Sequence, residues 1–138
     1  FSAARAEHLQ ATIRPALAAG GWVVCDRFID STRVYQGDLN RIDRAFLAAV
    51  ERHVVGATMP ALTFILDLPI AAMRARMLQR ADANRFDAAR DREHELRRDG
   101  FLRIAREEPG RCVVVDASAS EDEIAGALWS IVAARLAP

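Results

Sequence analysis

The segment from residue 26 to residue 37, Asp-Arg-Phe-Ile-Asp-Ser-Thr-Arg-Val-Tyr-Gln-Gly, carries a dense set of residues that could do chemistry. It opens with Asp26 and Arg27, directly after an apolar run. A carboxylate there can hold Mg²⁺ directly or through water, and the planar fork of a guanidinium can bind a phosphate bidentately. More hydroxyl and amide groups follow at near-helical spacing, on Ser31, Thr32, Tyr35 and Gln36. The segment predicts a phosphate site, and the competing interpretation is a salt bridge beside a capped turn.

Arginines dominate a second segment, between residues 74 and 92. They are Arg74, Arg76, Arg80, Arg85, Arg90 and Arg92. Arg76 and Arg80 share one helical face, and Arg85 lies in a polar break between two helical stretches. A loop that carries arginines over a phosphate site can stabilise the charge of a transferring phosphoryl group. Acidic residues are interspersed, so a solvated helix face is the competing interpretation.

Phe1 and Arg5 are one helical turn apart. An aromatic ring and a guanidinium on one face can stack on a nucleobase and hydrogen-bond its edge. The same spacing also fits a core phenylalanine beside a surface arginine.

Three short apolar runs, 22–25, 62–66 and 112–115, would position these groups. Continuous β-branched runs are typical of strands buried in a parallel sheet. Each run leads into an aspartate, which is Asp26, Asp67 or Asp116. Ligands of open α/β sheets bind at the carboxyl ends of the strands, so all three aspartates are expected at the ligand-binding edge.

Helical patterns separate these runs. Apolar periodicity and turn signals predict helices over 2–19, 42–54, 69–80 and 91–107. Pro15 predicts a kink or a new turn in the first helix. Ser120 and Glu123 form a capping box before a last helix. Strand and helix alternate, which predicts an α/β fold with a parallel sheet and flanking helices.

Composition excludes several classes of protein. The 138 residues are one domain's worth of sequence, and 51% hydrophobic with 28% charged residues excludes general disorder. The formal net charge of zero argues against a nucleic-acid-binding polycation, and no apolar run is long enough for a transmembrane helix. Cys25 and Cys112 are far apart in apolar runs, which favours reduced core thiols in the cytoplasm.

Lysine is absent from the sequence, and all 19 basic residues are arginine. Chemistry that needs a lysine therefore cannot come from these residues alone, and no Walker A motif is present. The sequence opens at Phe1 in a helical pattern rather than at a methionine, so we expect it to be the interior of a longer chain.

Together these segments resemble the thymidylate kinase family of P-loop nucleoside monophosphate kinases. The resemblance rests on residues 1–5, 13–17, 20–24, 26–37, 60–67, 76–87 and 115–118, in order along the chain. The Asp-Arg-x₃-Ser-Thr-x₂-Tyr-Gln-Gly string is its most specific part, whereas Ala61 stands where the family usually has aspartate. The family's first strand and phosphate loop precede the position of Phe1. The resemblance implies the C-terminal two thirds of a P-loop NTPase-type domain over 1–138, with three strands present.

The family transfers the γ-phosphoryl group of ATP to dTMP, with Mg²⁺, and yields dTDP. The resemblance implies an acceptor site within about residues 1–40 and a lid over about 74–92. It implies a cytoplasmic homodimer without nucleic-acid or membrane partners, paired through the helices near 42–55 or 9–17. The implied roles are catalytic for Arg27, Arg80 and Arg85, metal-binding for Asp26, and substrate-binding for Phe1, Arg5, Arg27, Thr32, Tyr35 and Gln36.

Two alternatives stay open at this point. One is a related P-loop kinase for deoxynucleosides or another nucleotide. The other is a non-catalytic nucleotide-binding remnant that lacks the donor site. In either case, the 138 residues alone are expected to be inactive.

Overall fold

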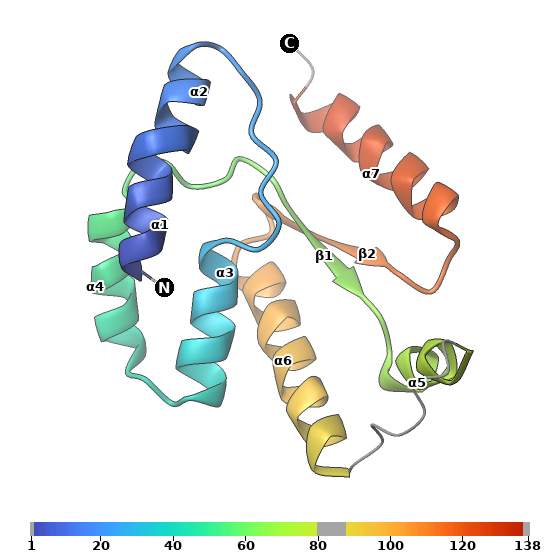
Figure 1. Ribbon diagram of the computed structural model, residues 1–138. Coiled ribbons are helices and arrows are strands. Elements are labelled where there is room, and N and C mark those ends of the chain that lie inside the picture. Colours follow the sequence, from blue (N-terminus) through green and yellow to red (C-terminus); the bar gives the residue numbers. More distant parts are fainter. Residues whose placement is uncertain (1, 80–87, 137–138) are drawn as a thin grey trace. The chain divides into compact units, whose positions relative to one another are not determined.

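The computed structural model describes residues 2–79 and 88–136 (Figure 1). The chain divides into two compact units, Phe1–Pro60 and Ala61–Pro138. Within the described ranges, no helix is long and apolar enough to cross a bilayer.

The first unit is helical. Its elements are α1 (Ser2–His8), η1 (Leu9–Ile13), α2 (Arg14–Ala18), α3 (Ile29–Thr32), η2 (Arg33–Leu39) and α4 (Arg44–Val54). The predicted first helix is thus present in three pieces, with a π-helical turn directly before Arg14-Pro15. Proline lacks the N–H that would continue the α-helical ladder, and a local π-turn is one way to accommodate that loss. The predicted interruption at Pro15 is confirmed.

The core of the first unit joins segments that are far apart in sequence. Leu9, Ile13, Ile29 and Val55 are buried together. Leu9 and Ile13 belong to the apolar stripe predicted for the first helix, so that stripe faces the core. Ile29 begins α3, and its burial anchors the start of that helix beneath the segment that carries Asp26 and Arg27.

Residues 22–25 do not form a strand, and here the sequence-based prediction was wrong. The structure leaves Trp22 64% and Val24 96% exposed. A strand exists only with a hydrogen-bonded neighbour, and the described part of the first unit provides none. Cys25 was expected in the core and is exposed for the same reason, whereas Cys112 is buried as expected.

The second unit contains the sheet. Strands β1 (Thr63–Asp67) and β2 (Cys112–Asp116) pair in parallel, with Thr63 opposite Cys112 and Asp67 opposite Asp116. Helices α5 (Ile70–Gln79) and α6 (Ala88–Glu107) connect them, and α7 (Glu121–Leu136) follows β2 (Figure 1). α6 packs on both strands. The predicted parallel pairing is confirmed for these two strands, in a chain whose described residues are mostly helical.

The carboxyl end of β1 is fixed to two other elements. The Asp67 carboxylate accepts hydrogen bonds from Arg98 on α6, at 2.6 Å from Nε to Oδ1 and 2.8 Å from Nη2 to Oδ2. This bidentate bond raises the pKa of Arg98. The Asp67 carbonyl accepts a bond from the Ala117 amide at 2.8 Å. Asp67 therefore joins β1, α6 and the loop after β2.

Replacing Asp67 by asparagine should destabilise the protein. Asp67→Asn keeps one acceptor but loses the charge and half of the bidentate bond, while the two side chains are only 18% and 36% exposed. We expect the free energy of unfolding to fall by about 1–2 kcal/mol. Urea denaturation of the product of the complete reading frame measures it. The control is Glu107→Gln, which breaks the exposed Arg103–Glu107 pair on α6; an equal loss in both variants would contradict the role of Asp67.

The predicted capping box at the start of α7 is confirmed. The Ser120 amide and hydroxyl donate to Glu123 Oε2 at 3.0 and 2.6 Å, and the Glu123 amide donates to Ser120 Oγ at 3.3 Å. The bonds from Ser120 to the carboxylate lower the pKa of Glu123.

This capping box should make stability depend on pH. A lowered folded-state pKa means that the charged Glu123 stabilises the protein above its ordinary pKa, and that this is lost as the pH falls through the lowered value. Wild type should therefore exceed Glu123→Gln in unfolding free energy at neutral pH, and the difference should vanish on acidification. Denaturation series between about pH 7 and pH 3 test this. In a Ser120→Ala background, the pH-dependent difference in unfolding free energy between proteins with and without Glu123→Gln should shrink. An undiminished difference would show that the capping box does not cause the pH dependence.

Candidate functional site

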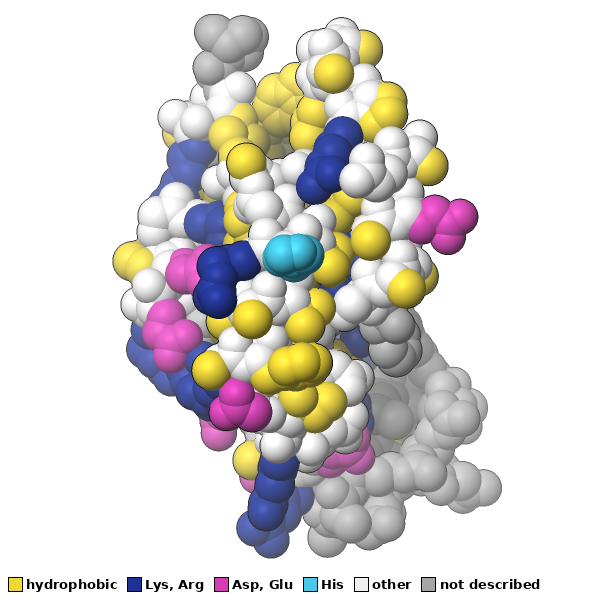
Figure 2. Space-filling view, turned by 90° about the vertical axis from the view of Figure 1, so that its left-hand side faces the viewer, with side chains coloured by type: hydrophobic (Ala, Val, Ile, Leu, Met, Phe, Trp, Pro, Cys, Tyr) yellow, Lys and Arg dark blue, Asp and Glu magenta, His cyan; other side chains and the backbone are white. Residues whose placement is uncertain are grey.

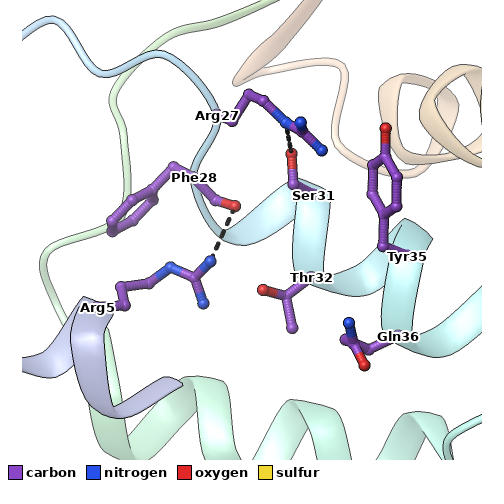
Figure 3. Close-up of a pocket in the computed structure, with 7 residues that line it drawn as sticks. All are labelled: Arg5, Arg27, Phe28, Ser31, Thr32, Tyr35 and Gln36. Atoms are coloured by element: carbon purple, nitrogen blue, oxygen red, sulfur yellow. Dashed lines mark hydrogen bonds between the residues drawn. The ribbon is translucent and has the colours of Figure 1, made fainter. Parts of the chain in front are cut away.

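A cavity of about 470 Å³ opens within the first unit. Its lining comes from α1, from the turn after residue 25, and from α3 and η2 (Figure 3). The lining residues are Arg5, Arg27, Phe28, Ser31, Thr32, Tyr35 and Gln36. The structure thus brings together five residues predicted from sequence, of which Arg5 lies more than twenty positions from the others.

Arg27 occupies an unusual backbone conformation, with φ of 65°. The left-handed region is uncommon for a non-glycine residue, and such residues often cluster at functional sites. The turn lets the guanidinium of Arg27 lie 4.7 Å from the centroid of the Tyr35 ring. Arg27 Nε also donates to Ser31 Oγ at 3.4 Å (Figure 3). Ring and hydroxyl together restrain the orientation of the fork.

Arg5 approaches the cavity from α1. Its Nη2 donates to the Phe28 carbonyl at 3.3 Å, and its Cζ lies 5.4 Å from the centroid of the Phe28 ring (Figure 3). Burial lowers the pKa of Arg5, while the carboxylates of Glu51 and Asp30 act in the opposite direction. Arg5 is thus a partly desolvated cation at the cavity wall, and it is well suited to hydrogen-bond a polar ligand group.

Thr32, Tyr35 and Gln36 line the cavity from α3 and η2, at the near-helical spacing seen in the sequence. Sequence reasoning gave no role to Phe28 and included Ser31 only in the polar string. Their signals were present: Ser31 follows Arg27 by four residues, and Phe28 is the residue next to Arg27. Neither spacing reveals a contact by itself, because both depend on the left-handed turn at Arg27.

Asp26 is exposed beside Arg27 and is not among the lining residues. Across the described ranges, no three His, Cys, Asp or Glu side chains gather to hold a metal. Mg²⁺ is commonly bound by one or two carboxylates, with substrate phosphates and water completing its shell. A single exposed carboxylate next to an arginine that could bind a phosphate fits that mode.

The middle of the predicted lid, residues 80–87, lies outside the described residues and includes Arg80 and Arg85; Phe1 also lies outside them. Two arginines before Arg80 are described, and both make contacts inside the second unit. Arg74 pairs with Asp91. Arg76 Nη2 donates to the carbonyls of Ala117 and Ala119, at 2.7 and 3.0 Å. These two side chains brace α5 rather than extend freely into solvent.

The cavity offers two different kinds of recognition. Arg27, held by a ring and a hydroxyl, presents a fork suited to a phosphate. Arg5 and the polar side chains of Thr32 and Gln36 present hydrogen-bonding groups beside aromatic surface. A ligand with an anionic end and a planar polar end, such as a nucleotide, matches both.

Comparisons with known proteins identify the family. The family model for thymidylate kinase matches residues 1–127. The chain is 48% identical over 134 residues to a thymidylate kinase of Caulobacter vibrioides and 44% identical over 139 residues to one of Rhodopseudomonas palustris. It also resembles the crystal structure of thymidylate kinase from Ehrlichia chaffeensis, with 28% identity and a TM-score of 0.74 over 96% of this chain and 63% of that one.

These relatives are longer than the chain. The matches cover 97% of this chain but 64% of the Caulobacter protein, and 99% of this chain but 60% of the Rhodopseudomonas protein. The fold is that of a P-loop kinase of this type, represented here by its two described parallel strands and their helices. With a family match over most of its length, and with the family's motif residues gathered at one cavity, the chain belongs to the thymidylate kinase family.

Proposed function

We propose that the full-length protein transfers the γ-phosphoryl group of ATP to dTMP and yields dTDP and ADP. The observation that carries this proposal is the pair of guanidiniums, Arg27 and Arg5, that line one cavity and each lie against an aromatic ring. The reaction is proposed because the chain belongs to this family, and the side chains that line the cavity suit its acceptor, dTMP.

Arg27 is the group proposed to hold the acceptor phosphate. In the transfer, a phosphate oxygen of dTMP forms a bond to the γ-phosphorus while the bond from that phosphorus to the β,γ-bridging oxygen breaks. Negative charge shifts onto the leaving ADP, so cations and orientation provide most of the catalysis. A fork fixed by Tyr35 and Ser31 keeps the attacking oxygen in one position.

Arg5 is proposed to hydrogen-bond the edge of thymine, with Phe1 stacked on the base. Thr32, Tyr35 and Gln36 are proposed to line the nucleoside pocket within an acceptor site of about residues 1–40. Their positions around the cavity support this assignment, whereas Phe1 lies outside the described residues.

Binding of the phosphoryl donor, ATP, needs groups that the 138 residues supply only in part. Mg²⁺ neutralises phosphate charge when bound, and Asp26 is proposed to help hold it. Arg80 and Arg85, in a lid of about residues 74–92, are proposed to face the transferring phosphoryl group. P-loop kinases also use a lysine on the β- and γ-phosphates, and no lysine occurs in the 138 residues. Activity tests therefore need the product of the complete reading frame.

Replacing Arg27 should abolish most activity without unfolding the protein. We expect Arg27→Ala to lower kcat/KM for dTMP by at least about 10²-fold. Arg27→Lys should also be poor, because a point charge reproduces neither the bidentate fork nor its stacking on Tyr35. The measurement is dTMP-dependent ADP release, with circular dichroism as the test of folding.

Arg106→Ala is the matched control, because Arg106 is an exposed arginine on α6 in the other unit. Near-normal activity of Arg27→Lys would exclude the bidentate role. A panel of nucleoside monophosphates and deoxynucleosides, tested on wild type, separates dTMP from the acceptors of related kinases. No turnover of any acceptor would favour a nucleotide-binding remnant.

A homodimer is the proposed assembly, with α4 as the pairing helix. Leu9 and Ile13 are used in the core of the first unit, which leaves little of the helix stripe near 9–17 for a partner. α4 is strongly amphipathic yet buries no residue fully, and Phe46 on it is 59% exposed. Hydrophobic side chains are visible on this face of the molecule (Figure 2). A second copy would cover them.

A charge on α4 should therefore dissociate the dimer. We expect Phe46→Glu to convert a dimeric wild type into a monomer at micromolar concentration, since pairing would bury the new carboxylate. Light scattering after size exclusion measures the mass. Leu17→Glu, at a side chain of α2 that is 46% exposed, is the control and should stay dimeric. A monomeric wild type, or dissociation by Leu17→Glu alone, would reject α4 as the interface.

A further inference from the structure

Phe28 makes two contacts with Arg5, although the two residues are 23 positions apart in the chain. Its carbonyl accepts a hydrogen bond from Arg5 Nη2 at 3.3 Å, in a partly buried environment. The Cζ atom of Arg5 also lies over the Phe28 ring, 5.4 Å from its centroid (Figure 3). Both residues line the cavity. A single residue thus contacts the guanidinium of Arg5 through its backbone and through its side chain.

The Phe28 ring is itself supported by the core of the first unit. Phe28 is partly buried and packs against the core cluster of that unit, to which Leu9 belongs. Leu9 is fully buried and follows Arg5 by four residues, so the two side chains lie on one face of the first helical segment. The same core therefore holds both the ring of Phe28 and the helix that carries Arg5.

The backbone of Phe28 is set by the left-handed turn before it. Arg27 has a φ of 65°, and Phe28, with φ of −129° and ψ of −136°, is the non-helical N-cap residue of α3. In this conformation the Phe28 carbonyl lies within hydrogen-bond distance of Arg5. One peptide bond joins the arginine proposed for the phosphate to the residue that contacts Arg5, so the positions of the two guanidiniums are linked.

The two contacts restrain different motions of the Arg5 guanidinium. The hydrogen bond fixes Nη2 but lets the plane turn about that bond, whereas a ring that faces the guanidinium opposes the turn. The face of an aromatic ring attracts a cation, and more strongly where water is partly excluded. Arg5 is half-buried, so this condition is met. Ring and carbonyl together therefore define an orientation that neither contact defines alone.

We propose that Phe28 is a positioning residue, whose ring and carbonyl hold the guanidinium of Arg5 in the orientation in which it meets a ligand. Without the ring, Arg5 would keep one hydrogen bond of 3.3 Å and would sample other orientations at the cavity wall. Because Arg5 is assigned to the edge of the nucleobase, the expected effect on dTMP rests on the proposed function.

The test is Phe28→Leu in the product of the complete reading frame. Leucine keeps an apolar side chain against the core and keeps the backbone carbonyl, but it removes the ring. We expect KM and Kd for dTMP to rise about three- to tenfold, with kcat changed less than about twofold, because Arg5 acts on binding rather than on transfer. Phe28→Tyr keeps the ring and should stay within about twofold of wild type.

A double-mutant comparison separates this role from a direct contact between Phe28 and the ligand. In an Arg5→Ala background, Phe28→Leu should change Kd for dTMP by less than about twofold, since the two residues act as one unit. An undiminished effect in that background would assign Phe28 to the ligand itself and would overturn the proposal.

Met59→Ala is the matched control. Met59 packs against the same core cluster but is not among the residues that line the cavity. This variant should lower thermal stability and leave KM for dTMP unchanged. An equal rise of KM in Met59→Ala and Phe28→Leu would show that damage to the core alone weakens dTMP binding, and the role of the ring would be rejected.

A second measurement needs no nucleotide. The Nε–H proton of Arg5, assigned by the loss of its NMR signal in Arg5→Ala, should exchange with water faster in Phe28→Leu than in wild type, Phe28→Tyr or Met59→Ala. An unchanged exchange rate in Phe28→Leu would overturn the positioning role even if dTMP binds. If wild type does not bind dTMP, the proposed function fails, yet the exchange rates still decide the inference. Phe28→Met, which also lacks a ring, replaces Phe28→Leu if that variant does not fold.

Discussion

A guanidinium recognises a phosphate or a base edge only when its plane is held in one orientation, and this requirement governs much of the chain. All 19 basic residues are arginine, so every cationic contact depends on a long side chain with costly rotamer freedom. The structure restrains several of them with fixed partners. Arg27 stacks on the Tyr35 ring, and Arg5 contacts the ring and the carbonyl of Phe28. Arg98 donates hydrogen bonds to both carboxylate oxygens of Asp67. Orientation is thus secured before any ligand arrives.

The same restraint explains how the carboxyl end of the sheet is ordered. Asp67 holds Arg98 through its side chain and Ala117 through its carbonyl. Arg76 in turn holds the carbonyls of Ala117 and Ala119. The loop after β2 is therefore tied to β1 and α5, and through Asp67 to α6, by groups that are charged or backbone. In parallel α/β sheets, ligands generally bind at this edge.

Sequence reasoning located the elements whose signals are local. The capping box of Ser120 and Glu123, the break at Pro15 and the two strands that end at Asp67 and Asp116 were all predictable within a residue or two. The run at 22–25 carries the same strand signal and forms none. Residue type reports the tendency of a segment to pair, whereas pairing itself needs a neighbour that is not encoded in the segment.

Most residues of the candidate site could be predicted from the sequence, but the contacts between them could not. Residue types and spacing selected Arg27, Thr32, Tyr35 and Gln36 and paired Arg5 with Phe1, and the family resemblance then gave these residues their expected roles. The stacking of Arg27 on Tyr35 depends on a backbone φ of 65° at Arg27, which no preference of arginine would suggest.

That single dihedral angle also bears on Arg5. The turn at Arg27 precedes Phe28, whose carbonyl and ring contact Arg5 from 23 residues away. Ile29 then anchors α3 in the core, and Asp30 and Arg33 follow within one helical turn. The strained residue is thus the arginine proposed to hold the phosphate, and it directly precedes the residue that contacts Arg5. Strain of this kind persists only where the surroundings fix it. Here the buried Ile29 follows closely, as do the ion pairs that Arg33 makes with Asp30 and Glu51.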